Sequence, residues 1–100
     1  IAAAIEEYRR ALQIRDDFPE AHTNLGTALA ADGQLAAAVA EYEAALHWKP
    51  DHAAAHRGLG LALAEMGQRE RAVAELETAV ALDPVNADTR QQLERLRAPR

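Results

Sequence analysis

The sequence predicts an all-helical protein made of repeated units that stack on one another, and three observations point to this fold class. When the sequence is aligned with itself at a shift of 34 residues, many identical residues coincide. Of its 49 apolar residues 25 are Ala, the strongest helix former. Apolar residues also recur at the i, i+3, i+4 and i+7 positions of amphipathic helices. The coinciding residues are Ala21-His22 with Ala55-His56, Leu25-Gly26 with Leu59-Gly60, Gly33-Gln34 with Gly67-Gln68, and Pro50 with Pro84. A period of this length indicates units that cannot bury their apolar faces alone.

Composition and charge argue against several classes of protein. The net charge is -5, whereas a nucleic-acid-binding protein is expected to carry a basic stripe, so Arg9, Arg10 and Arg15 are interpreted as a solvated face. No apolar run approaches the length of a membrane span, and no leader is recognised. Cys is absent, which excludes disulfides and thiolate metal sites. The chain opens with Ile1, so it is interpreted as a fragment or a processed product that need not retain a targeting signal. With that reservation, a cytoplasmic location is expected.

The first complete unit is predicted to contain two helices. The first runs from Pro19 to about Asp32 and carries an apolar stripe every three or four residues. Gly33 ends it. The second runs from about Leu35 to Trp48, and Pro50 removes a backbone donor and stops it. The stripes consist of His22, Leu25, Gly26 and Leu29 on the first helix and Ala38, Val39, Tyr42, Ala45 and Leu46 on the second.

The next unit repeats this plan, with Gly67 as its internal break and Pro84 at its end. A Gly within a helix costs about 1 kcal/mol relative to Ala, yet Gly26 and Gly60 both lie on the buried stripe. The expected gain is the close approach of the backbone of a neighbouring helix.

The two ends of the chain match half-units. Residues 1–16 match the second helix of a unit, and residues 87–97 match a first helix in which Glu94 and Arg97 replace packing residues. A half-polar stripe suits a terminal cap, whose outer face meets water. We therefore expect a single domain of residues 1–100, truncated at its start. Its parts are a second helix (1–18), two full repeats (19–52 and 53–86) and a capping helix (87–100).

At this period, the pattern Ala-His-x-x-Leu-Gly-x-x-Leu, then Gly, then Ala-x-x-x-Tyr/Leu-x-x-Ala, then Pro resembles the tetratricopeptide repeat. It is similar to bacterial multi-repeat arrays and to the repeat arm of O-linked N-acetylglucosamine transferases. The resemblance implies an all-α, right-handed superhelix, or solenoid, of antiparallel helix hairpins. It also implies that the first helices line a concave groove that receives peptides. His22 and His56 stand where the family often has Trp or Tyr, which suggests looser packing there.

The resemblance places a set of polar and small residues in this groove. They are Glu20, Thr23, Asn24, Thr27, Arg57, Gly58, Leu61 and Glu65, followed on the capping helix by Asp88, Gln91, Gln92 and Arg95. Asn24 is the most suggestive of them, because an amide both donates and accepts and can hold a peptide backbone. Some members of the family clamp the C-terminal carboxylate of chaperones with Lys and Asn. Only Asn24 fits that pattern, so no such clamp is expected.

Catalysis and cofactors are not predicted. His52 and His56 have the spacing of two metal ligands on one helix face, but the sequence places no third ligand beside them. Glu41, Glu43, Glu75 and Glu77 recur at surface spacing and are interpreted as solvated. No nucleophile elbow or phosphate-binding loop is present.

The leading hypothesis for function is a protein-binding module whose groove holds an extended peptide segment. A second hypothesis is self-association or an architectural role, with a homodimer through the first helix. Its residues are Ile1, Ile5, Tyr8 and Leu12. A third is the substrate-selecting arm of a larger enzyme, such as a glycosyltransferase. Neither nucleic acid nor membrane is expected as a partner.

Overall fold

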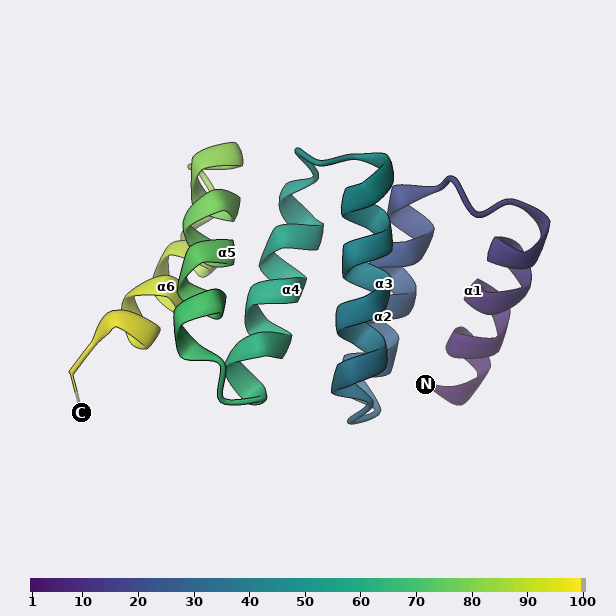
Figure 1. Cartoon of the computed structure of the whole chain (residues 1–100), viewed down its shortest axis with the longest axis horizontal. Coiled ribbons are helices and arrows are strands. Elements are labelled where there is room, and N and C mark those ends of the chain that lie inside the picture. Colours follow the sequence, from purple (N-terminus) through teal and green to yellow (C-terminus); the bar gives the residue numbers. More distant parts are fainter. Residues whose placement is uncertain (100) are drawn as a thin grey trace.

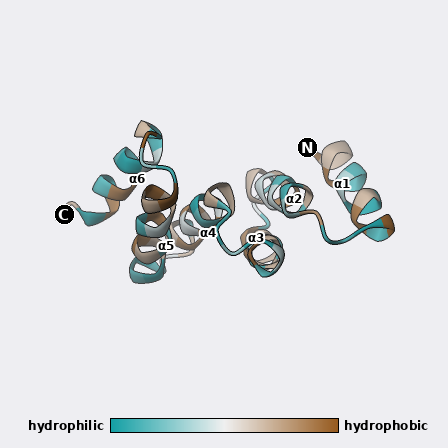
Figure 2. Cartoon of the chain, turned by 90° about the horizontal axis from the view of Figure 1, so that it is seen from above, coloured by the Kyte–Doolittle hydropathy of each residue, from teal (hydrophilic) through white to brown (hydrophobic). Residues whose placement is uncertain are grey.

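The computed structural model describes residues 1–99, which form one row of helices without a strand among them (Figure 1). The helices are α1 (Ala2–Ile14), α2 (Pro19–Ala31), α3 (Leu35–Trp48), α4 (Ala53–Glu65), α5 (Arg69–Leu82) and α6 (Ala87–Arg97). Each packs mainly on its neighbours in sequence, and α2 also contacts α4. Seen from above, the helices follow a zigzag from α1 to α6 (Figure 2). The body measures 44 × 25 × 19 Å. The prediction of an all-α helical array is confirmed.

Two glycines end the first helices of the two complete repeats. Gly33 and Gly67 have φ angles of 83° and 82°, a left-handed conformation that side chains disfavour. After α2, the Gln34 amide donates to the Leu29 carbonyl at 2.9 Å, and the Gly33 amide donates to the Ala30 carbonyl at 3.0 Å. These two bonds make a Schellman motif, which satisfies carbonyls at the helix end. The chain can therefore reverse within three residues and return as α3.

Small residues let the helices approach closely. Four alanines of α3, α4 and α5 are completely buried, and three leucines fill the largest enclosed positions between them. The alanines are Ala38, Ala45, Ala55 and Ala72, and the leucines are Leu29, Leu63 and Leu76. Because a protein interior is close-packed, a thin stack with so few large side chains needs short distances between its helices. The high alanine content thus serves packing as well as helix propensity.

Gly26 and Gly60 lie where the sequence predicts close contacts. A Cβ atom built on Gly26 would lie 2.9 Å from Cε1 of Tyr42. One built on Gly60 would lie 2.9 Å from Cγ of Leu76 and 3.2 Å from the carbonyl oxygen of Ala72. Another helix does approach both glycines, but the nearest atoms at Gly26 all belong to the Tyr42 side chain, so the expectation of a close backbone is wrong there. At Gly60 the Ala72 carbonyl oxygen is close, although the Leu76 side chain is closer.

His22 and His56 connect a loop to a second helix in the same way. The Nε2 atom of His22 lies 2.6 Å from the Asp16 carbonyl oxygen, and its Nδ1 atom lies 2.8 Å from the Glu41 carboxylate. His56 repeats the arrangement at 2.7 and 3.0 Å, with the Pro50 carbonyl and the Glu75 carboxylate. The interpretation of Glu41 and Glu75 as solvated is therefore wrong, since both are half-buried against an imidazole ring. The expectation of looser packing at the two histidines is wrong, because each ring makes two specific polar contacts.

Helix α6 ends the stack with a mixed surface. Asn86 caps its N-terminus by accepting a hydrogen bond from the Thr89 amide at 3.2 Å. Leu93 packs inward with 6% of its surface exposed, while Glu94 and Arg97 are exposed. Arg97 forms an ion pair with Glu77 of α5. Helix α6 is thus apolar on the side that packs on α5 and charged on the side that meets water.

Helix α1 covers the opposite end of the core, and its apolar residues differ in exposure. Ile5 is only 4% exposed and belongs to the core, and Tyr8 and Leu12 are half-buried against it. Ile1 remains 64% exposed. The expectation that all four form a surface for self-association is corrected for Ile5, because packing on α2 already buries it.

Candidate functional site

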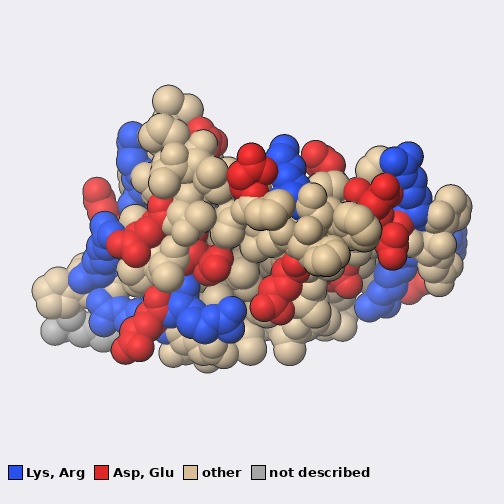
Figure 3. Space-filling view, turned by 45° about the horizontal axis from the view of Figure 1, so that its top comes forward, with Lys and Arg blue, Asp and Glu red and all other residues tan. Residues whose placement is uncertain are grey.

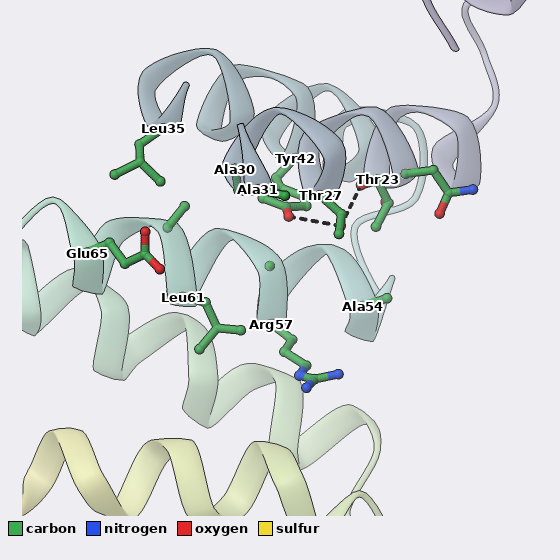
Figure 4. Close-up of a pocket in the computed structure, with 13 residues that line it drawn as sticks. Thr23, Thr27, Ala30, Ala31, Leu35, Tyr42, Ala54, Arg57, Leu61 and Glu65 are labelled. Carbon is green, nitrogen blue, oxygen red and sulfur yellow. Dashed lines mark hydrogen bonds between the residues drawn. The ribbon is translucent and has the colours of Figure 1, made fainter. Parts of the chain in front are cut away.

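A hollow of about 440 Å³ lies between the first helices α2 and α4 (Figure 4). Residues on facing sides of the two helices line it, with contributions from α3. They are Thr23, Asn24, Thr27, Ala30, Ala31, Leu35, Tyr42, Ala54, Arg57, Gly58, Leu61, Ala62 and Glu65. Six of the predicted groove residues with side chains are among them, together with Gly58. We call this hollow the α2–α4 groove.

Tyr42 reaches the floor of the α2–α4 groove from the second helix of the repeat. Its side chain passes between α2 and α4, and only 3% of its surface is exposed. The Thr27 hydroxyl donates to the Thr23 carbonyl at 3.0 Å, so the Tyr42 hydroxyl, 3.0 Å away, donates to Thr27 (Figure 4). Burial raises the pKa of Tyr42, and the bond to Thr27 and the charge of Arg57 offset part of that rise. The floor is thus a rigid, neutral aromatic ring with a satisfied hydroxyl.

The α4 side presents a cation, an apolar residue and an anion in succession. Arg57, Leu61 and Glu65 are four residues apart, a spacing that places all three on one helix face. Figure 4 shows them along α4 in that order, with Leu61 in the middle. The Nε atom of Arg57 donates to the Gln92 side-chain oxygen at 3.2 Å, which orients the half-buried guanidinium.

The α2 side is polar at one end and apolar at the other. The Thr23 hydroxyl donates to the Pro19 carbonyl at 2.8 Å and is buried, so it shapes the wall but offers no free donor. Asn24 is exposed, and its amide has no hydrogen-bond partner among residues 1–99. Ala30, Ala31 and Leu35 form the apolar end. The Asn24 side chain thus lies at the surface of the groove without a contact that fixes its amide.

The remaining predicted groove residues lie outside this hollow. Glu20 is exposed in the first turn of α2, close enough to His52 for its charge to act on that ring. Gln92 is half-buried and only supports Arg57, whereas Asp88, Gln91 and Arg95 are exposed along α6. Helix α6 follows α4 and α5 in the row, and none of its residues lines the α2–α4 groove. A ligand would meet α6 only if it continued past α4.

Sequence reasoning missed Tyr42 and Leu35 as groove residues, because it assigned Tyr42 to the buried stripe and gave Leu35 no role. Both belong to a second helix, whereas the predicted groove uses first helices alone. One signal in the sequence points to Tyr42: Gly58 stands 16 residues after it, whereas Asn24 and Gln92 hold the equivalent places after Tyr8 and Leu76.

The two histidines with metal-ligand spacing, His52 and His56, do not form a pair of ligands in the structure. Both ring nitrogens of His56 already face oxygen atoms, so it cannot pair with His52 as a ligand. Burial lowers the pKa of His52. Within residues 1–99 no three His, Asp or Glu side chains come together as a metal site would need.

No described helix is both long and apolar enough to cross a bilayer. Acidic and basic side chains are interspersed on the face shown in Figure 3.

These features define a class: a helical-repeat protein in which paired helices stack and their first members border a groove. The chain belongs to the tetratricopeptide repeat family. A model described as a tetratricopeptide repeat matches residues 29–96, and one described as a TPR repeat matches residues 1–33. A comparison with curated proteins finds no significant match.

Solved structures with the same fold include several repeat proteins. "First TPR of Spaghetti (RPAP3) bound to HSP90 peptide SRMEEVD" has 20% sequence identity and a TM-score of 0.90, over 93% of this chain and 74% of that one. "YrrB: a TPR protein with an unusual peptide-binding site" has 26% identity and a TM-score of 0.87, over 93% of this chain and 48% of that one. The Arabidopsis OM64 TPR domain has 20% identity and a TM-score of 0.90, over 93% and 77%. The chain thus spans about half the length of YrrB. The resemblance to O-linked N-acetylglucosamine transferases stays a prediction.

Proposed function

We propose that the chain is a protein–protein interaction module that holds an extended peptide segment in the α2–α4 groove. The observation that supports this best is the groove itself, a hollow of about 440 Å³ bordered by the exposed Asn24 amide and the oriented Arg57 guanidinium. It is also bordered by an apolar strip that consists of Ala30, Ala31, Leu35 and Leu61. Sites of this volume with a few convergent polar groups are the usual places for ligands. Two similar structures, one described with a bound HSP90 peptide and one with an unusual peptide-binding site, agree with a peptide as ligand.

The proposal does not include a clamp for a C-terminal carboxylate. The groove contains a single cation, Arg57, and its α2 side contains no Lys or Arg. An internal segment, which has neither terminus, fits a groove with one cation and one anion better than a free carboxylate does. No catalytic step forms part of the proposed function.

A test of this function begins with selection from a displayed library of random peptides. The variant Leu61→Asp places a charge on the apolar strip and should abolish capture of the selected peptides. Ala40→Asp makes a comparable change at an exposed position of α3 outside the groove, and it should leave capture intact. If Leu61→Asp, still folded by circular dichroism, captures peptides as the unmodified chain does, the groove is not the binding site.

Self-association through α1 is a second candidate, favoured by one comparison between repeats. Ala11 is exposed on α1, whereas the equivalent Ala45 and Ala79 are 0% and 2% exposed on α3 and α5. Ile1, at 64% exposure, adds an apolar side chain to the same helix. A face that a helix covers in the other repeats is open here, and a second copy of the chain could cover it. Sedimentation at several concentrations tests this candidate, and a strict monomer at the highest concentration would exclude it.

A further inference from the structure

The α4 wall of the groove carries two opposite charges with an apolar residue between them. Arg57 and Glu65 are eight residues apart, which corresponds to about 12 Å along a helix, and Leu61 lies halfway. Among the described residues that line the groove, they are the only ionisable ones apart from the buried Tyr42. A ligand that lies along α4 therefore meets a positive, an apolar and a negative side chain at steps of about 6 Å.

An extended peptide has nearly the same repeat distance. Its side chains point alternately to opposite sides, and alternate residues are about 6.6 Å apart. Residues one, three and five of such a segment can therefore face Arg57, Leu61 and Glu65 together. The match between one helical turn and two extended residues means that a straight peptide stays in register over this length.

The charge of each wall residue selects what it faces. Arg57 has no ion-pair partner within 4.0 Å among the described residues. It also lines a second, smaller hollow together with Asp83, but the two side chains do not form an ion pair. Its Nε atom is held by Gln92, and its two terminal nitrogens have no hydrogen-bond partner among residues 1–99. Glu65 is exposed and likewise has no ion pair in the described part of the chain. Both charges are thus available to a ligand.

We infer that the partner segment has the pattern acidic–x–apolar–x–basic, read in either chain direction. This inference rests on the proposed function. Its acidic side chain lies against Arg57, its apolar side chain lies against Leu61, and its basic side chain lies against Glu65. Such a ligand carries no net charge over these five residues. It therefore avoids the repulsion that the overall charge of -5 would exert on a purely acidic segment.

The test uses synthetic peptides in a Gly-Ser frame, measured by fluorescence anisotropy. Glu-Ser-Leu-Ser-Lys and its reverse, Lys-Ser-Leu-Ser-Glu, are compared with Glu-Ser-Leu-Ser-Glu, with Lys-Ser-Leu-Ser-Lys and with a shuffled peptide in which Glu and Lys are adjacent. At least one of the first two should bind more tightly than each control by about two- to fivefold per mismatched charge, the range of an exposed ion pair. The advantage should shrink in about 1 M salt, where screening acts within a few ångströms.

A charge reversal in the protein gives the decisive comparison. Glu65→Lys should invert the preference, so that Glu-Ser-Leu-Ser-Glu becomes the tighter ligand. The control Glu70→Lys makes the same change at an exposed position of α5 that does not line the groove, and it should keep the original order. An unchanged order in Glu65→Lys overturns the inference. If peptides bind and depend on Leu61 but ignore charge, the inference fails and the proposed function stands. If Leu61→Asp has no effect on binding either, both fail.

Discussion

The ring of Tyr42 occupies the space that a side chain at position 58 would need. A Cβ atom built on Gly58 would lie 2.4 Å from both Cε1 and Cζ of Tyr42, far inside van der Waals contact. The two residues belong to different repeats, since Tyr42 is on α3 and Gly58 is on α4. Where the second helix has the shorter Leu76, the equivalent position holds a full side chain, Gln92. Asn24 holds the equivalent place after Tyr8, whose side chain is only half-buried. The glycine is thus matched to the buried position of the Tyr42 ring and not to a tyrosine in the sequence alone.

This relationship predicts strong coupling between positions 42 and 58. Gly58→Ala should destabilise the protein by about 1–3 kcal/mol, the range of overpacking in a closed core, because the buried ring has little room to move. In a Tyr42→Leu background the same substitution should cost much less, since the ring is gone. Chemical denaturation of the two single variants and the double variant measures the coupling. Additive effects would show that the ring yields easily to a methyl group.

Gly60 and Leu61 are neighbours on α4, but Gly60 packs against α5 whereas Leu61 lines the groove. Gly60→Leu should lower the melting temperature far more than Leu61→Ala does. The first forces a large side chain against Leu76, 2.9 Å from the built Cβ, whereas the second trims a half-buried groove residue. Overpacking of about 1–3 kcal/mol is a large share of the stability of a thin domain. Thermal unfolding followed by circular dichroism checks this, and equal melting temperatures would contradict the assignment of Gly60 to the buried stripe.

The elements that the sequence predicts well depend on local chemistry. The breaks after α2 and α4 follow from Gly33 and Gly67, whose left-handed backbone disfavours any other residue. The break after α3 follows from Pro50, because a proline beyond the first turn of a helix removes a backbone donor and clashes with the preceding turn. The stripe that predicts Gly26 and Gly60 is likewise a matter of helical spacing. None of these inferences requires knowledge of which helices meet in space.

The groove is predicted only in part, because its shape depends on contacts between helices. Helical spacing identifies Asn24 and Arg57 as neighbours of the buried stripe, and both line the hollow. It does not show that the Tyr42 ring is long enough to reach the groove floor. Nor does it show that Glu41 turns inward to His22, since a Glu on an otherwise polar face has the pattern of a solvated residue. Both features depend on side-chain length and direction across an interface.

Tyr42 also predicts how stability changes at alkaline pH. Burial raises its pKa above the ordinary value of 10.0, so the folded state holds the phenolic proton more tightly than the unfolded state does. The resulting stabilisation is complete below about pH 10 and is lost as the pH rises through the raised value. Denaturation midpoints from neutral pH to about pH 11 should therefore fall more steeply in Tyr8→Phe, which retains Tyr42, than in Tyr42→Phe. Equal slopes in the two variants would contradict the raised pKa.

Asn24 offers a test that separates binding from folding. Its side chain is exposed and has no hydrogen-bond partner among residues 1–99, so Asn24→Ala should leave the melting temperature unchanged. If the amide holds a peptide backbone, the same substitution removes a hydrogen bond worth about 0.5–1.5 kcal/mol and weakens binding about two- to tenfold.

The matched control for Asn24 is Gln91→Ala, because Gln91 is an exposed amide on α6 that lies outside the α2–α4 groove. Titration of a selected peptide against both variants should show weaker binding for Asn24→Ala alone. Weaker binding for both would mean that the ligand continues past α4 along α6, where the sequence also places Asp88 and Arg95. Unchanged affinity for Asn24→Ala, or a loss of affinity matched by a loss of stability, would remove Asn24 from the site. The contacts of a ligand would then have to come from the α4 wall, where Arg57 and Glu65 are the polar groups that remain.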